Sequence, residues 1–181
     1  QFLLWILHHQ HIIKLVYTIR PGIKSLTNTT STYVYTIDNF ISEDECNFLI
    51  DAAQDCLQPS TVTGFGKEEG RRISSARTSW TCRLHRDDLP ILMNSVMTLT
   101  NKPLEHIEHP QLARYESTQQ FKPHYDAYDE TNPTLKETLE DGGNRLVTIL
   151  IYLNDVEVGG ATKFPLLNIE VQPKKGMAVV F

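Results

Sequence analysis

"RLVTILIYLNDVEVGGATKFP", residues 145–165, is the stretch of sequence that decides the fold. Its first eight residues are almost all β-branched, aliphatic or aromatic, a composition that favours a strand. Polar residues and Gly159–Gly160 then indicate turns, before the next strand-like segment begins at "ATKFP". Similar short segments are "QLARYEST" (111–118), "NIEVQP" (168–173) and "GMAVVF" (176–181). The pattern predicts a β-sandwich, barrel or jelly roll from residue 112 onward.

Two helices are expected before these strands. Ser42 and Glu45, three residues apart, form a capping box, and apolar residues recur at helical spacing behind them as far as Leu57. A second helix is expected over residues 88–100, where Pro90 suits the first turn. Both helices are assigned to packing and not to chemistry.

Composition restricts the class of protein. A chain of 181 residues with 40% apolar and 22% charged residues suits one soluble globular domain. A net charge of −5 argues against non-specific nucleic-acid binding, and the arginines between residues 71 and 86 are interpreted as a solvated face. The three cysteines form no C-x-x-C pair, which disfavours a zinc or thioredoxin-type site and leaves open one disulfide plus a free thiol.

The N-terminal region is interpreted separately. "FLLWILHHQHIIKLVYTI" (2–19) is mostly apolar but is interrupted by histidines and Lys14. It is marginal for a spanning helix, and is interpreted either as the end of a membrane anchor or as a buried or interfacial helix. Residues 20–32 are rich in Ser, Thr, Gly and Asn and indicate a linker. Residues 1–32 are therefore expected to be a possible anchor remnant and linker, and residues 33–181 to be the domain.

"FKPHYDAYDE" (121–130) carries the candidate chemistry. His124 and Asp126 are two positions apart, and on an extended segment such side chains point to the same face. An imidazole nitrogen and a carboxylate oxygen are both good ligands for a divalent metal such as Fe(II). A surface histidine and a turn aspartate are the alternative interpretation.

Taken with its flanks, this motif resembles the prolyl 4-hydroxylase family of Fe(II)/2-oxoglutarate dioxygenases. The resemblance lies in "ARY", then Q-x-F-x-x-H-x-D, "GNRLVTILIYLNDV", "GGATKFP" and V-x-P-x-K-G, with looser matches at "FISEDECNFLI" and "ARTS". It implies an α+β fold: a double-stranded β-helix, or jelly roll, with supporting helices before it. It also implies that the third metal ligand, a histidine, and a lysine for 2-oxoglutarate would lie beyond Phe181. The chain is therefore expected to be a fragment, incomplete at its C-terminus and inactive on its own, and cut at its front as well.

The resemblance also assigns roles to residues around the motif. Tyr115 and Thr148 would bind 2-oxoglutarate. Arg145 would be a catalytic residue that also binds substrate, and Arg77 and Ser79 would line the groove for the peptide. A further position, Phe121, is a tyrosine in many members, which leaves the substrate preference open.

The implied function is peptidyl-proline 4-hydroxylation, coupled to decarboxylation of 2-oxoglutarate to succinate, with Fe(II), O2 and ascorbate. The expected partner is a proline-containing peptide or protein, and the expected location is the lumenal side of the endoplasmic reticulum membrane, with the cytoplasm as the alternative. Two other functions stay open: a non-catalytic jelly-roll binding module, and the same chemistry on another substrate. The polar loop 127–143 is expected to have few apolar contacts and to close over a bound peptide.

Overall fold

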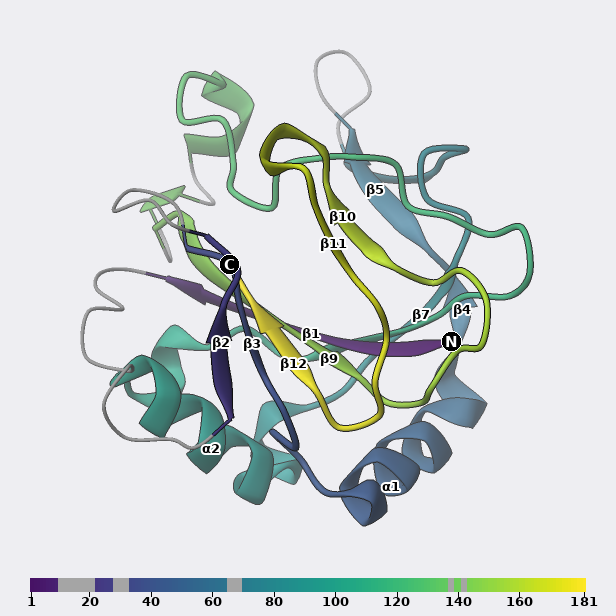
Figure 1. The fold of residues 1–181 in the computed structure, drawn as a ribbon. Coiled ribbons are helices and arrows are strands. Elements are labelled where there is room, and N and C mark those ends of the chain that lie inside the picture. The colour runs from purple at the N-terminus through teal and green to yellow at the C-terminus, as the bar shows by residue number, and fades with distance from the viewer. Residues whose placement is uncertain (10–21, 28–32, 65–69, 137–138, 141–142) are drawn as a thin grey trace.

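A computed structural model describes residues 1–9, 22–27, 33–64, 70–136, 139–140 and 143–181. Its centre is an eight-stranded sheet in the order β2-β3-β12-β9-β1-β8-β7-β4, in which every neighbouring pair is antiparallel. Figure 1 shows the two helices below the strands of this sheet. The strands of the sheet are β1 (Phe2–His9), β2 (Ile23–Ser25), β3 (Tyr35–Ile37), β4 (Gln58–Pro59), β7 (Trp80–Arg83), β8 (Gln111–Arg114), β9 (Arg145–Tyr152) and β12 (Ala178–Val180).

The middle of the sheet is buried on both faces, which explains why the sequence of β9 is almost continuously apolar. Ile149 and Ile151 belong to the core on one face, whereas Leu150 and Tyr152 belong to the core on the other. Successive side chains of a strand point to opposite faces, so a strand between two cores needs apolar residues at nearly every position. Thr148 lies on the same side of the strand as Leu150 and Tyr152, and this is the side that carries the candidate site.

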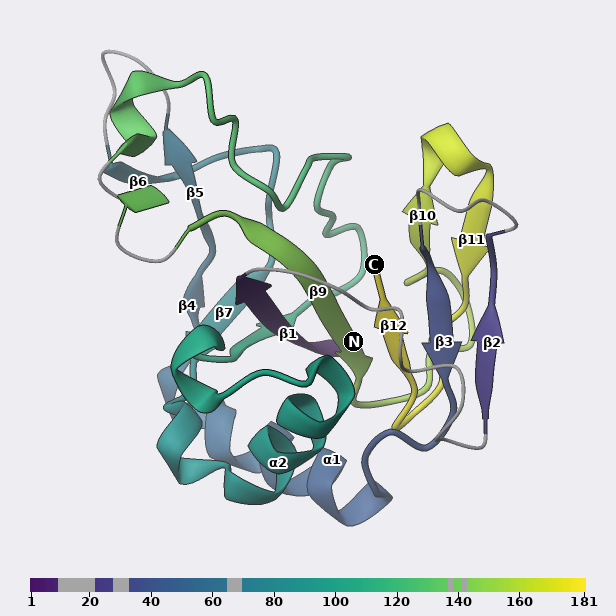
Figure 2. The ribbon, with the colours of Figure 1, turned by 90° about the vertical axis from the view of Figure 1, so that its left-hand side faces the viewer.

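Two helices cover one face of the sheet (Figure 2). Helix α1 (Glu43–Ala53) begins at Ser42, whose hydroxyl accepts from the backbone of Glu45 in the expected capping box. Helix α2 (Pro90–Thr100) begins with the expected proline in its first turn. Buried residues of both helices pack against Leu4, Ile6 and the inner side chains of β9 in one large core. The prediction of two packing helices is confirmed.

The opposite face is covered by the hairpin of β10 (Thr162–Phe164) and β11 (Ile169–Val171), which supplies Val171 to a second core. Figure 2 shows this hairpin standing beside β3 and β12. The predicted strands of the C-terminal part are thus present, and the fold class is confirmed as a jelly-roll arrangement of antiparallel strands with helices on one side. A further hairpin and five short 3-10 helices complete the described structure: β5 (Thr61–Gly64), β6 (Gly70–Ile73), η2 (Gln54–Cys56), η3 (Arg86–Asp88), η4 (Leu104–His106), η5 (Pro133–Leu135) and η6 (Pro165–Leu167).

The expectation of a helix at the N-terminus is wrong over residues 2–9. These residues form β1, which is paired with β8 on one side and with β9 on the other. Leu4 and Ile6 are fully buried among the residues of the helix-side core, and Leu3 is buried on the opposite side. A short apolar run does not distinguish a doubly buried strand from a helix, and pairing on both sides decides in favour of the strand.

The predicted domain boundary at residue 33 is also wrong, because β1 and β2 both belong to the main sheet. Ile23–Ser25 pairs with Tyr35–Ile37, in a stretch that was expected to be a linker. His11 and the other residues of 10–21 lie outside the described residues, so the remainder of the predicted anchor segment is not tested. Among the helices of the described residues, none combines the length and the apolar content that a membrane crossing requires.

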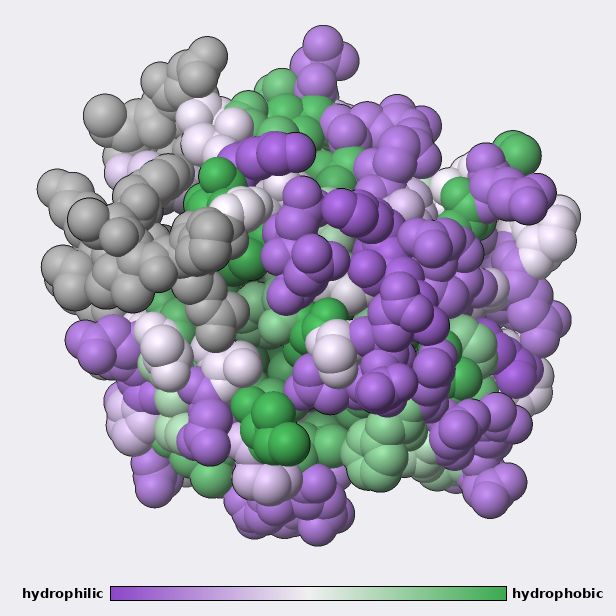
Figure 3. Space-filling view, turned by 60° about the horizontal axis from the view of Figure 1, so that its bottom comes forward, coloured by the Kyte–Doolittle hydropathy of each residue, from purple (hydrophilic) through white to green (hydrophobic). Residues whose placement is uncertain are grey.

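Two further features concern the side of the molecule that the helices form. Figure 3 shows apolar side chains in the middle of this face, bordered by hydrophilic ones. Phe48 and Ile91, both mostly exposed, line a groove of about 380 Å³ between α1 and the start of α2. Nearby, a disulfide joins Cys56 to Cys82, and Cys46 is a buried free thiol.

Candidate active site

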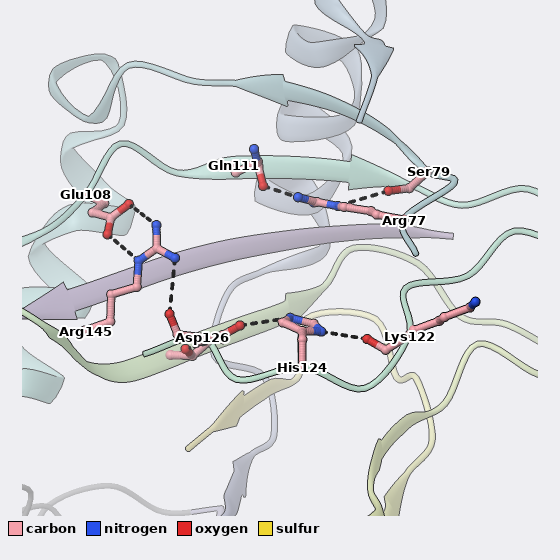
Figure 4. A network of polar contacts seen from close by, with 9 residues as sticks. Arg77, Ser79, Glu108, Gln111, Lys122, His124, Asp126 and Arg145 are labelled. Atoms are coloured by element: carbon pink, nitrogen blue, oxygen red, sulfur yellow. Dashed lines mark hydrogen bonds and ion pairs between the residues drawn. The ribbon is translucent and has the colours of Figure 1, made fainter. Parts of the chain in front are cut away.

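The candidate metal ligands lie in the segment between β8 and β9, on the face of the sheet opposite the helices. The Nε2 atom of His124 and the Oδ1 atom of Asp126 are 3.0 Å apart. Figure 4 shows the two side chains pointing toward one another. Their i, i+2 spacing therefore brings the two candidate ligand atoms to one point, as the sequence predicts.

Each of the two side chains also has a second hydrogen-bond partner, which fixes its orientation. The Nδ1 atom of His124 is 2.8 Å from the backbone carbonyl of Lys122, and a proton on Nδ1 leaves the lone pair of Nε2 free. The hydroxyl of Thr148 donates to Oδ2 of Asp126 at 2.6 Å, so Oδ1 remains the oxygen that faces the histidine. Hydrogen bonds of this kind orient metal ligands and are typical of built metal sites.

The pair fits part of an Fe(II) site, since one imidazole and one carboxylate are two members of the two-histidine, one-carboxylate ligand set. Among the residues that the structure describes, no three His, Cys, Asp or Glu side chains form a group that could hold a metal ion. His124 and Asp126 thus stand as two ligands of a candidate site.

Arg145, at the start of β9, is fixed beside this pair by Glu108. Its Nε and Nη2 atoms donate to the two carboxylate oxygens of Glu108 at 2.7 and 3.1 Å, and Nη1 donates to the backbone carbonyl of Asp126 at 3.3 Å. The guanidinium also lies over the ring of Tyr128, 4.6 Å from its centroid. Burial lowers the pKa of Arg145, but the hydrogen bonds and charge of Glu108 outweigh burial and leave that pKa above its ordinary value. Arg145 is therefore a permanent, oriented cation next to the metal pair.

Arg77 and Ser79, which were expected to line a peptide groove, are both buried, at 8% and 2% exposure. Arg77 donates to Ser79 at 3.4 Å and to the side-chain oxygen of Gln111 at 3.0 Å (Figure 4). Burial lowers the pKa of Arg77, and Tyr115 and the charge of Asp126 offset part of that change.

Aromatic contacts connect Arg77 with the candidate metal ligand His124. Phe121 stacks on His124 with ring centroids 3.6 Å apart, and the guanidinium of Arg77 lies over the same Phe121 ring at 4.7 Å. Trp5 of β1 lies 6.3 Å from His124 and 6.5 Å from Phe121. The phenylalanine that stands where many family members have tyrosine is therefore a direct neighbour of a candidate metal ligand.

The expectation of few apolar contacts in the loop 127–143 is wrong at Leu135, which is buried at 6% exposure. The base of the loop is closed by Asn144, which accepts from the backbone nitrogen of Tyr128 and donates to its carbonyl. Asn144 also donates to Glu130. Residues 137–138 and 141–142 lie outside the described residues, and closure of the loop over a peptide stays a prediction.

The structure brings all seven predicted site residues into one region, in two connected groups. The first group contains His124, Asp126, Thr148 and Arg145, and the second contains Arg77, Ser79 and Tyr115. Their roles as metal, co-substrate and substrate residues stay predictions. Sequence reasoning missed Glu108 and Trp5, because a single glutamate gives no periodic or spacing signal and Trp5 lies in the segment that was interpreted as a helix. Pairing of Phe2–His9 with β8 and β9 is the feature that places Trp5 here.

Comparisons with known proteins agree with this geometry. A family profile described as the 2OG-Fe(II) oxygenase superfamily matches residues 110–181. "Probable prolyl 4-hydroxylase 10" of Arabidopsis thaliana is 31% identical over 165 residues, which covers 79% of this chain and 55% of that protein. "Prolyl 4-hydroxylase 5" of the same organism is 35% identical over 142 residues, covering 75% of this chain and 46% of that protein.

A solved structure is also similar: the viral collagen prolyl hydroxylase vCPH from Paramecium bursaria chlorella virus-1, in its 2OG complex. The TM-score is 0.57 with 26% identity, over 83% of this chain and 78% of that chain. The chain spans about half the length of the curated relatives it matches. The matched segment contains His124, Asp126, Thr148 and Arg145, the residues that the structure brings together. The chain belongs to the prolyl 4-hydroxylase family of 2-oxoglutarate- and Fe(II)-dependent oxygenases.

Proposed function

We propose that this chain forms part of an enzyme that hydroxylates prolines in a peptide or protein at carbon 4. In this reaction one oxygen atom of O2 enters the proline and the other enters succinate, as 2-oxoglutarate loses CO2. The observation that carries the proposal is the convergence of Nε2 of His124 and Oδ1 of Asp126, 3.0 Å apart, in a chain of this family. Fe(II), when bound, supplies the oxygen chemistry.

The residues of the chain contribute orientation and charge. His124 and Asp126 would hold the metal, with Thr148 and the carbonyl of Lys122 fixing which atoms face it. Arg145, held by Glu108, would place the peptide beside the metal. Its side chain is mostly buried and already oriented, so little conformational entropy is lost when a substrate carbonyl accepts a hydrogen bond from it.

The experiment uses the full-length protein that contains this chain, incubated with Fe(II), 2-oxoglutarate, O2 and a proline-rich peptide. We expect succinate and hydroxyproline to form in equal amounts, and His124→Ala to abolish both. Arg145→Ala is expected to raise KM for the peptide or to lower kcat, with little change in 2-oxoglutarate affinity. Succinate without hydroxyproline, for every peptide tried, would indicate the same chemistry on another substrate. Absence of both products would favour a non-catalytic binding module.

Two accessory proposals concern conditions for this activity. Ascorbate would restore activity lost when iron is oxidised in turnovers without substrate. An oxidising compartment such as the lumen of the endoplasmic reticulum is supported by the disulfide between Cys56 and Cys82, since disulfides are rare in reducing compartments. Localisation of the tagged full-length protein by microscopy, with and without reductant-sensitive labelling of its thiols, tests the second proposal.

A further inference from the structure

The groove between α1 and the start of α2, called the α1–α2 groove below, has apolar side chains that the core does not use. Phe48 of α1 and Ile91 of α2 line it and are 59% and 70% exposed. The buried sides of the same helices, which include Cys46 and Val96 at 0% exposure, already belong to the core. Single exposed apolar side chains are ordinary in soluble proteins, but a patch of them in one groove is typical of an interaction site.

Acidic side chains border the α1–α2 groove. Asp44 and Glu45 belong to the first turn of α1, Asp88 precedes the start of α2, and all three are part of the lining. Glu45 accepts from Ser42 in the capping box, whereas Asp44 and Asp88 are exposed to a partner. No basic side chain is present among the described residues that line this groove. The hydrophilic border of this face (Figure 3) is therefore negative at the groove.

The sign of the border distinguishes the occupants that the groove could take. A second copy of the chain, docked by the same face about a two-fold axis, would bring two acidic borders together, and like charges in contact are unfavourable. The anionic surface of a membrane would be repelled for the same reason. A helix that carries aliphatic or aromatic residues along one face, with lysine or arginine beside them, complements both the apolar lining and its border.

We propose that the α1–α2 groove docks a basic amphipathic helix of a partner protein. The groove, of about 380 Å³, would receive the large apolar side chains of that helix, and Phe48 and Ile91 would be buried against them. The two helices cover the face of the sheet opposite the candidate metal pair, so a docked helix would leave the candidate active site open (Figure 2). The proposal is therefore independent of the proposed function.

The test titrates the full-length protein with three fluorescein-labelled peptides and follows fluorescence anisotropy. The first peptide carries leucine at positions i, i+3, i+4 and i+7 of a helix and lysine on its other face. The second has glutamate in place of lysine, and the third has the composition of the first in an order that forms no apolar face. We expect the first peptide to bind at least about 10-fold more tightly than the other two. Added salt should weaken its binding, because exposed ion pairs are screened.

Substitutions in the groove identify where the first peptide binds. Phe48→Ser and Ile91→Ser should each weaken it by about 10-fold, because each removes apolar surface that docking buries. Asp44→Asn combined with Asp88→Asn should weaken it and reduce the salt dependence. Leu166→Ser is the matched control, since Leu166 is 85% exposed but lies in η6, on the hairpin of the opposite face. Urea unfolding and proline hydroxylation should be unchanged in all these variants.

The proposal is overturned if the lysine and glutamate peptides bind equally, or if Leu166→Ser weakens binding as much as Ile91→Ser. Absence of peptide binding overturns it as well, and two further measurements then show what the groove does. A dimer in sedimentation that Ile91→Ser dissociates would assign the groove to a second copy of the chain. A photo-crosslinking residue placed at Ile91 that reacts within the same chain would assign it to a segment of this protein. A monomer without such a cross-link would remove the docking role altogether.

Discussion

Replacement of Thr148 by valine tests how the candidate metal site is built. The two side chains have nearly the same shape, so the change removes one hydroxyl from a position that is 3% exposed. That hydroxyl donates to Oδ2 of Asp126 at 2.6 Å, and the aspartate side chain is itself only 15% exposed. Without this bond, nothing fixes which carboxylate oxygen faces His124. Metal affinity is therefore expected to fall.

The size of the effect follows from the geometry. A hydrogen bond to a charged group contributes about 1.5–3 kcal/mol, and tenfold in affinity corresponds to about 1.4 kcal/mol. The expected loss of metal affinity is therefore about 10- to 100-fold. The loss of an outer hydrogen bond at metal sites typically has this same size. The short distance and the low exposure of both partners place the expectation toward the upper end of that range.

The assay is a Mn(II) titration of the full-length protein, followed by calorimetry or electron paramagnetic resonance. Thr100→Val is the matched control, since Thr100 is also buried but donates to the backbone carbonyl of Val96 in α2, far from the site. Equal Mn(II) affinity in wild type, Thr148→Val and Thr100→Val would refute the orienting role. If Mn(II) binding is unchanged but 2-oxoglutarate binding weakens, Thr148 contacts the co-substrate, as the resemblance implies.

Three other predictions concern stability. Leu4→Ala should lower the free energy of unfolding by about 2–5 kcal/mol, because Leu4 is fully buried in the helix-side core, and a negligible loss in urea titration would contradict the placement of β1. Removal of the Cys56–Cys82 disulfide, which is separated by 26 residues, should cost about 3–4 kcal/mol, read from unfolding of the double serine variant. Burial raises the pKa of Tyr152 to about 12, above its unfolded value of 10.0. The contribution of its neutral hydroxyl to the free energy of unfolding is therefore complete below pH 10 and is lost as pH rises toward 12. Unfolding measured across that window should show a fall of about 2–3 kcal/mol that Tyr152→Phe reduces, and an identical fall in both proteins would argue against it.

Local signals predicted the elements that local chemistry determines. Ser42 and Glu45 begin α1 through hydrogen bonds within four residues, and Pro90 begins α2 because its ring suits a first turn. The i, i+2 spacing of His124 and Asp126 likewise needs no distant residue to bring the two ligand atoms together. These features were predictable because each depends on neighbours in the sequence.

The features that were missed depend on residues far apart in the chain. Glu108 precedes Arg145 by 37 positions, and no pattern in either segment indicates that they form a bidentate pair. The apolar run at residues 2–9 has the composition of a buried helix or a buried strand, and only its two partners in the sheet decide between them. Long-range pairing of this kind is specified by the whole fold, so a single sequence does not show it.

The position of β1 links this long-range pairing to the chemistry of the site. β1 lies between β8, which leads to Tyr115, and β9, which carries Thr148 and Arg145. Neighbouring strands are about 4.8 Å apart, so β1 separates the two parts of the site by about 10 Å, which is the width of one inserted strand. The register of β1 is fixed because a shift by one residue would turn its buried side chains to the wrong faces. The same register places Trp5 against His124. The N-terminal strand, outside the segment matched by the family profile, therefore sets both the width and one wall of the candidate active site.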